Sequence, residues 1–407
     1  MGLLAVLVVV FSVWTYQRNY VWTNALVLWE DCVAKSPNKA RPHSNLGMIL
    51  QGQGKVNEAM SHYEKAIEID PLQIPAHNNL GLALEMTGRP NEAIKEFLTA
   101  IHLDPGSAKI RNNFSRVLLE TGEFNEAIKQ SSIALKLNPD NTVAYNNMGL
   151  ALAALGKHDE AMKQFLYALH LYPDDAEVRC NLALALADQG KIKESIAQYK
   201  YALQINPGIA EAHNGLGLVL KKQGDLDGAI REFQETLRIE PENKRARSNL
   251  QMQLAARGRV DSVAAGVKAE LGRDPQDARI YVKLGDVYRS GGDLVRAVVS
   301  YEKALSIEPG NMGALSNLAM VHAGREEYEK AIDVLKKVIE IQPGSSGAYY
   351  NIACIYARQG KVDESVRWLK TAVEKGFADW GLLREDKDLE SIKATSYYKE
   401  LLNKHTM

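Results

Sequence analysis

Asparagine recurs in this sequence at a spacing that could place primary amides in a row. Eight asparagines are separated by 34 residues or by multiples of 34: Asn45, Asn79, Asn113, Asn147, Asn181, Asn249, Asn317 and Asn351. The two gaps in the series hold Gly215 and Lys283. A primary amide both donates and accepts hydrogen bonds, so such a row can pair with the backbone of an extended polypeptide regardless of its side chains. The alternative is that the amides bond one another and water.

Basic residues gather in one part of the same pattern. Between Lys244 and Val260 there are five basic residues and no acidic one. Five basic residues are expected on the same face as the amides and would form a basic patch there: Lys221, Arg245, Arg279, Lys283 and Arg289. Clustered cations would favour an acidic peptide as the ligand. A charged face that only meets solvent is the alternative.

The elements that must position these residues follow from a second series with the same spacing. Ten prolines stand 34 residues apart: Pro37, Pro71, Pro105, Pro139, Pro173, Pro207, Pro241, Pro275, Pro309 and Pro343. This is the period of a repeat made of two helices. We number each repeat from Ala40 as position 1, which puts the asparagines at position 6. Positions 8 and 20 hold Gly, Ala or Ser in nine repeats of ten, and position 15 is Gly in nine. Small residues let two helices approach closely, and a glycine at position 15 can end the first helix.

On these residues, 40–379 resemble ten tandem tetratricopeptide (TPR) repeats. The resemblance implies an all-α solenoid, a right-handed superhelix of helix–turn–helix repeats. Residues 20–39 are expected to form a half-repeat cap, and residues 380–407 a C-terminal capping helix. Repeat 7 departs most from the pattern, because Gln251, Val263 and Glu270 replace its small residues. We therefore expect a weak joint there, unless Glu270 has a buried partner.

Two further resemblances concern the inner, concave face, which the first helix of each repeat lines. The row of asparagines is similar to the asparagine ladder in the TPR region of O-linked N-acetylglucosamine transferases, which implies a grip on extended chains. Asn249, Arg279 and Lys283 are similar to part of the carboxylate clamp of chaperone-binding TPR domains. The rest of that clamp is missing, because Asn214 and Leu218 occupy its first two positions.

The N-terminal segment suggests contact with a membrane. Residues 3–16 are almost uninterruptedly apolar and are followed by aromatic residues, so residues 1–19 are expected to form a short membrane helix. A buried helix of the solenoid cap is the alternative. The run from Val21 to Pro42 is similar to the junction in transmembrane-and-TPR proteins related to protein O-mannosyltransferases. That resemblance implies a membrane-associated chain with its repeats on the extracytoplasmic side, whereas the basic residues on the repeat side favour the cytoplasm.

Other chemistry finds little support in the sequence. A formal charge of −1 argues against nucleic acid as a partner. Cys32, Cys180 and Cys354 form no disulfide framework or metal pair. Histidines at position 4 (His43, His77, His213) are better explained by packing than by a metal. We therefore expect no catalytic residues, no cofactor, no metal and no small-molecule substrate.

Two functions remain open. The first is a non-catalytic, membrane-tethered scaffold that binds extended polypeptide in its concave groove. The second is the acceptor-recruiting C-terminal region of a membrane glycosyltransferase whose catalytic domain is not in this chain.

Overall fold

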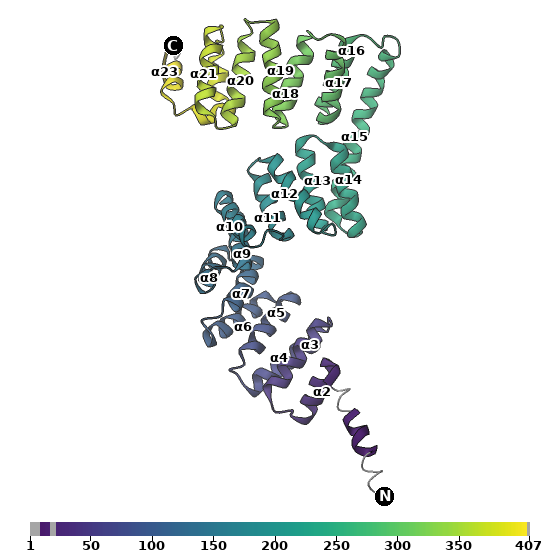
Figure 1. Cartoon of the computed structure of the whole chain (residues 1–407), viewed down its shortest axis with the longest axis vertical. Coiled ribbons are helices and arrows are strands. Elements are labelled where there is room, and N and C mark those ends of the chain that lie inside the picture. Colours follow the sequence, from purple (N-terminus) through teal and green to yellow (C-terminus); the bar gives the residue numbers. More distant parts are fainter. Residues whose placement is uncertain (1–8, 17–21, 405–407) are drawn as a thin grey trace. The chain divides into compact units, whose positions relative to one another are not determined.

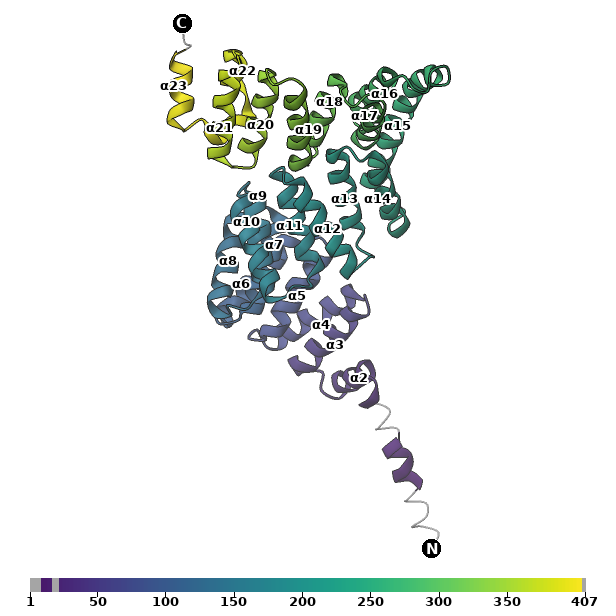
Figure 2. The same ribbon diagram turned by 45° about the horizontal axis from the view of Figure 1, so that its top comes forward.

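The computed structural model describes residues 9–16 and 22–404, and every regular element in these ranges is a helix. The chain divides into unit 1, residues 1–189, and unit 2, residues 190–407. Within each unit, consecutive helices lie side by side along the chain (Figures 1 and 2). The all-α solenoid expected from the sequence is therefore confirmed.

Unit 1 opens with α2 (Ala25–Lys35), whose Leu26, Trp29 and Val33 pack onto the core of the first repeats. The first helices of its repeats are α3 (Ala40–Gly52), α5 (Ile74–Met86), α7 (Ala108–Thr121), α9 (Thr142–Ala154) and α11 (Ala176–Asp188). The second helices are α4 (Val56–Ile69), α6 (Pro90–Leu103), α8 (Phe124–Leu137) and α10 (His158–Leu171).

Unit 2 begins with the second helix of repeat 5 and continues to the C-terminal cap. Its helices are α12 (Ile192–Ile205), α13 (Ala210–Gln223), α14 (Leu226–Ile239), α15 (Lys244–Leu271), α16 (Ala278–Ser290), α17 (Leu294–Ile307), α18 (Met312–Gly324), α19 (Tyr328–Ile341), α20 (Ser346–Arg358) and α21 (Val362–Glu374). The cap consists of α22 (Trp380–Glu385), the 3₁₀ helix η1 (Lys387–Ile392) and α23 (Ser396–Lys404). Leu383, Leu389, Ile392, Tyr398 and Leu401 of the cap are buried against the last repeat.

The recurring prolines mark the ends of the second helices. Proline cannot continue a helix, and the carbonyl of each such proline is left for another donor. Position 4 of the next helix supplies it: Nε2 of His77 lies 3.0 Å from the carbonyl oxygen of Pro71, and a nitrogen of Arg111 donates to Pro105 at 2.9 Å. His43 and His213 bond Pro37 and Pro207 in the same way. These histidines therefore hold the turn between repeats.

The two helices of a regular repeat meet at the small residue of position 8. In five repeats this residue is a glycine, and an aromatic ring from position 24 lies directly against it: Tyr63 against Gly47, Phe97 against Gly81, Phe165 against Gly149, Phe233 against Gly217, and Tyr301 against Gly285. A Cβ atom at Gly149 would stand 2.5 Å from Cε1 of Phe165, which is closer than two carbon atoms can pack. All five rings are almost fully buried.

Repeat 7 does not form the expected helix pair. Its residues instead belong to α15, a single helix of 28 residues. Gly258, at position 15, does not take the left-handed conformation that its counterparts Gly224 and Gly292 adopt. The large residues Gln251 and Val263 at positions 8 and 20 leave no close-packed seam that would favour folding back.

Two sets of contacts stabilise the second half of α15 as a continuation of the first half. Val260 and Ala264 enter the core formed with Leu284 and Tyr288 of α16. The guanidinium of Arg296 pairs with both Asp261 of α15 and Asp293. Although burial acts against its charge, the hydrogen bonds that Arg296 donates to these carboxylates hold the pKa of its guanidinium above its ordinary value.

Within the described part of the chain, Glu270 has no buried partner and does not enter a seam between two helices. Because α15 does not fold back, Glu270 stays at the surface, where its carboxylate lies 3.2 Å from Nζ of Lys283. An exposed ion pair of this kind contributes little to stability.

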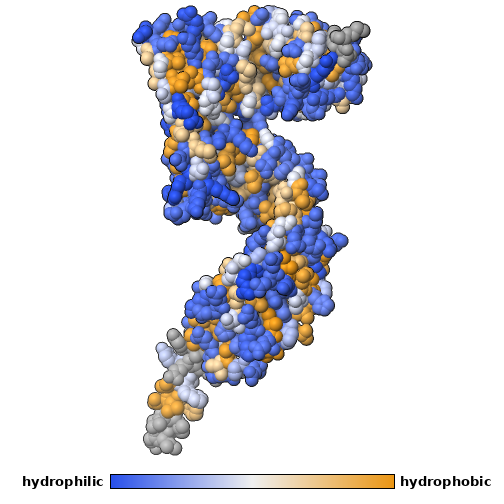
Figure 3. Space-filling view, turned by 180° about the vertical axis from the view of Figure 1, so that it is seen from behind, coloured by the Kyte–Doolittle hydropathy of each residue, from blue (hydrophilic) through white to orange (hydrophobic). Residues whose placement is uncertain are grey.

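The N-terminal segment is described only in part. Residues 9–16 are helical and leave Phe11 and Trp14 exposed, so this short stretch is largely hydrophobic at its surface (Figure 3). Across the described residues, no helix combines the length and the apolar character needed to cross a membrane. The rest of the apolar segment 3–16 lies outside the described residues.

We expect Gly149→Ala to lower the free energy of unfolding by about 1–3 kcal/mol, because the added methyl group must displace the ring of Phe165. Gly52→Ala is the matched control, since its Cβ would meet no atom within 4 Å. Hydrogen exchange of α9 and α10 in the full chain measures the effect. Unchanged protection in Gly149→Ala would show that this seam is not tightly packed.

A second substitution tests the straight course of α15. We expect Gly258→Ala to stabilise α15 by about 0.5–1 kcal/mol, because glycine is unfavourable inside a helix. Gly122→Ala is the comparison: Gly122 has a φ of 81° and open space around it, so alanine there should cost about 1–2 kcal/mol. Urea unfolding and hydrogen exchange report both values. A loss in Gly258→Ala as large as that in Gly122→Ala would mean that repeat 7 turns at this glycine.

Candidate functional site

The predicted site residues lie on the first helices of the repeats. We call the surface made by positions 5, 6, 9 and 12 of these helices the A-helix face. Positions 6 and 9 are three residues apart and therefore share one side of a helix. In unit 1 this face comes from α3, α5, α7, α9 and α11. The successive helices bring the amides close enough to bond from one repeat to the next.

The position-6 amides bond position 5 of the preceding repeat. Nδ2 of Asn113 donates to Oδ1 of Asn78 at 2.9 Å, and Nδ2 of Asn181 donates to Oδ1 of Asn146 at 2.9 Å. Nδ2 of Asn147 donates to the backbone oxygen of Asn112 at 3.1 Å. In unit 2, Asn249 donates to Asn214 in the same manner. Each primary amide has two N–H groups and one oxygen, so such a bond uses one donor of the group.

The remaining amides have different surroundings. Asn79 accepts a hydrogen bond from Asn78 at 3.0 Å. Asn317 donates to Oδ1 of Asp286 at 2.9 Å, so its acceptor is a carboxylate at position 9 of the preceding repeat and not an amide at position 5. Asn45 is partly exposed, and Asn351 is exposed on the wall of a cavity described below. The long helix α15 also interrupts the row in unit 2, since it takes the place of a helix pair between α14 and α16.

Exposed apolar side chains accompany the amides and were missed by the sequence analysis. They occupy position 9 and are between 38% and 52% exposed: Met48, Leu184, Leu218, Met252 and Met320. Their spacing of three residues from the asparagines was a usable signal. The A-helix face therefore offers both hydrogen-bonding groups and apolar surface to a ligand.

Most of the predicted basic patch is already paired with acids. Arg279 lies 2.9 Å from Asp277, Lys283 lies 3.2 Å from Glu270, and Arg289 lies 3.8 Å from Asp286. Lys221 on α13 and Arg245 on α15 are exposed. The neighbouring carboxylates offset much of the positive charge on which the preference for an acidic peptide rested. That preference stays a prediction.

One carboxyl on the A-helix face has an unusual acidity. The side chain of Glu85, at position 12, is 6% exposed and lies 2.7 Å from a nitrogen of Arg116. Burial raises the pKa of Glu85 to about 7, with Arg116 opposing the shift and Glu120 adding to it. This part of the face therefore changes its charge near neutral pH.

Metal binding finds no site in the described part of the chain, where no group of three or more His, Cys, Asp and Glu side chains could hold an ion. Cys180 and Cys354 are buried, and Cys32 is partly buried. His77 instead contacts Glu96, with 2.6 Å between Nδ1 and the carboxylate, and this hydrogen bond raises the pKa of His77.

Comparison with known protein families assigns most of these repeats. Models described as TPR repeat or tetratricopeptide repeat match residues 52–88, 74–107, 113–176, 183–224, 210–243, 278–311 and 322–383. Together they cover more than half of the chain. The matches stop at 243 and resume at 278, so they skip the residues of α15. No curated protein matches the sequence.

The solved structures to which this chain is similar include PilF, YrrB and the TPR domain of P58(IPK). PilF of Pseudomonas aeruginosa is 23% identical, with 53% of this chain and 96% of PilF covered and a TM-score of 0.46. YrrB, described as a TPR protein with an unusual peptide-binding site, is 22% identical, with 45% and 95% covered and a TM-score of 0.38. The TPR domain of P58(IPK) is 19% identical, with 90% and 99% covered and a TM-score of 0.28.

Proposed function

Because the chain is a tetratricopeptide-repeat protein, we propose that it is a non-catalytic scaffold that binds an extended polypeptide along its A-helix face. TPR repeats form scaffolds for protein–protein interaction, and the amide row is the observation that supports this mode of binding. The row repeats at each first helix of unit 1 from α5 to α11. Its amides at Asn79, Asn113 and Asn181 are partly exposed and can meet a ligand, whereas Asn147 is buried.

The amides and the apolar residues have separate roles in this proposal. The position-6 amides pair with backbone N–H and C=O groups, which every polypeptide offers. Bonds between repeats hold the amides of Asn113 and Asn181 in place before the ligand arrives, which lowers the entropy cost of binding. Apolar side chains of the ligand contact Met48 and Leu184 at position 9. Binding is therefore broad in sequence and selective for extended chains.

The test replaces Asn79, Asn113, Asn147 and Asn181 together by alanine. Each lost hydrogen bond should cost roughly 1 kcal/mol, so affinity for a reduced, alkylated and permanently unfolded polypeptide should fall by up to about a thousandfold. Fluorescence anisotropy with the labelled polypeptide measures affinity, and circular dichroism confirms that helicity is kept.

The matched control changes the partners of these amides. Asn78→Ser with Asn146→Ser removes two of the same bonds between repeats but keeps all four position-6 amides. We expect this variant to lose no more than about tenfold in affinity, because the position-6 amides remain and only the bonds that hold Asn113 and Asn181 in place are lost. Equal losses in both variants would show that weakened repeat packing, and not amide recognition, lowers affinity. An unchanged affinity in the fourfold variant would rule out the amide row as the binding site.

We also infer that residues 3–16 attach the chain to a membrane, with the repeats on the extracytoplasmic side. The exposed rings of Phe11 and Trp14 support this, because aromatic residues favour the membrane interface. In flotation with phosphatidylcholine vesicles, Phe11→Ser with Trp14→Ser should leave most of the protein at the bottom of the gradient. Leu72→Ser, at an equally exposed residue outside the segment, should float like the unchanged chain. Flotation of the double variant would contradict this attachment.

A further inference from the structure

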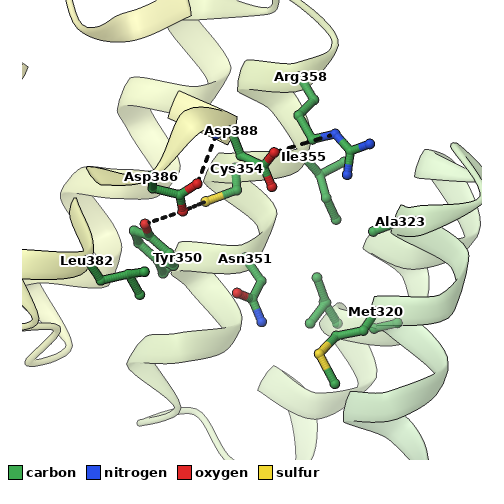
Figure 4. Close-up of a pocket in the computed structure, with 13 residues that line it drawn as sticks. Met320, Ala323, Tyr350, Asn351, Cys354, Ile355, Arg358, Leu382, Asp386 and Asp388 are labelled. Atoms are coloured by element: carbon green, nitrogen blue, oxygen red, sulfur yellow. Dashed lines mark hydrogen bonds and ion pairs between the residues drawn. The ribbon is translucent and has the colours of Figure 1, made fainter. Parts of the chain in front are cut away.

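A cavity of about 340 Å³ lies at the C-terminal end of the A-helix face of unit 2. Helices α18 and α20 form two of its sides, and the segment from α22 to η1 closes a third (Figure 4). Volumes near the lower end of the range for ligand pockets suit one side chain better than a large cofactor. The cap therefore adds to the last repeats a pocket that the amide row does not explain.

One part of the cavity is apolar. Met320, Ala323, Ile355 and Leu382 contribute to its lining, with Met320 and Leu382 on opposite sides of the opening (Figure 4). Met320 is 50% exposed and Leu382 is 46% exposed, so both are accessible from solvent. A chain of methylene groups lying between them would bury apolar surface on both sides.

The other part of the cavity is acidic. The carboxylate of Asp386 accepts hydrogen bonds from the hydroxyl of Tyr350 at 2.6 Å and from the backbone N–H of Asp388 at 2.9 Å, and it lies 3.6 Å from Sγ of Cys354 (Figure 4). These donors hold Asp386 in position at the end of the cavity. With the residues that the structure describes, Asp386 forms no ion pair.

The negative charge of the second carboxylate, Asp388, is only partly neutralised by a neighbouring cation. Asp388 lies 3.8 Å from Nε of Arg358, and its side chain is 48% exposed. Burial raises the pKa of Asp388, Arg358 opposes this and Asp386 adds to it. Two carboxylates and one guanidinium leave the cavity with a net negative charge, which favours a cation over an anion.

We propose that this cavity binds the side chain of a lysine or arginine in a partner polypeptide. The methylene stem lies between Met320 and Leu382, and the cation meets Asp386 and Asp388, so that one pocket satisfies both parts of the side chain. This goes beyond the proposed function, which specifies only an extended backbone. It adds a preference for a basic residue at the C-terminal end of the A-helix face of unit 2.

The experiment uses single amino-acid derivatives, which cannot span the amide row. The full chain, labelled with ¹³C at its methionine methyl groups, is titrated with Nα-acetyl-lysine methylamide, and the Met320 signal is assigned with Met320→Leu. We expect a shift of this signal with a Kd of about 1 mM or weaker, as suits a single side chain. Nα-acetyl-norleucine methylamide, which lacks the cation, should bind at least about fivefold more weakly.

Two variants identify the carboxylate that carries the effect. Asp388→Asn should weaken binding of the lysine derivative about fivefold or more, because it removes the exposed charge without touching the bonds that Tyr350 and Cys354 make to Asp386. Glu385→Gln removes the same charge from an exposed residue of α22 that does not line the cavity, and should leave binding unchanged. Equal binding of norleucine and lysine, an unaltered Kd in Asp388→Asn, or stronger binding of Nα-acetyl-glutamate methylamide would each overturn the proposal. All of these outcomes can occur whether or not the asparagines bind a backbone.

Discussion

The close approach of two helices at a small residue is the constraint on which the regular repeats depend. Gly149 and its counterparts leave room for a ring from the second helix, and that ring fills the space where a Cβ atom would stand. The contact fixes how the two helices cross, and hence which residues of the first helix remain on the surface. Where the pair changes, the chemistry of the seam changes with it: in repeat 3, Ser115 and Ser131 replace glycine and ring and bond each other at 2.8 Å.

The turn that follows the first helix depends on this seam more than on its own glycine. Glu326 occupies position 15 in repeat 9 and takes a φ of 60°, the only left-handed conformation of a residue other than glycine in the described part of the chain. Position 15 of repeat 7 holds a glycine, the residue type that favours such a turn, yet Gly258 lies within the helix α15. Ala319 and Ala331 keep the seam of repeat 9 small, whereas Gln251 and Val263 fill the seam of repeat 7. Packing between the helices therefore decides whether the chain turns, and a glycine only lowers the conformational free energy of the turn.

This explains which parts of the fold could be predicted from the sequence. The helix boundaries follow from local signals, because proline and glycine act on the residues beside them. That repeat 7 forms the single helix α15 depends on contacts between residues far apart in the sequence, which local signals do not show. These are Asp261 with Arg296, and Val260 with the core around Tyr288. In the same way, the asparagine row could be foreseen from its spacing. Its bonds to position 5 could not, since only four of the ten repeats hold an asparagine there: Asn78, Asn112, Asn146 and Asn214. The cavity at the cap joins residues of the last repeats to Asp386 and Asp388, which have no counterpart in the repeats.

The amide bonds between repeats also bear on how binding and rigidity are linked. A position-6 amide that donates to the preceding repeat holds two first helices at a fixed spacing, and that spacing sets the distance between successive groups presented to a ligand. A ligand bonded to several amides at once would in turn resist any change in that spacing, because stretching the row would break its bonds. Polypeptide binding and the stiffness of unit 1 should therefore increase together. In unit 2, α15 interrupts the row between Asn249 and Asn317, so a ligand bonded to the amides on one side of α15 would not stiffen the other side through amide bonds. The proposed binding of a basic side chain in the cap cavity would therefore not depend on the row.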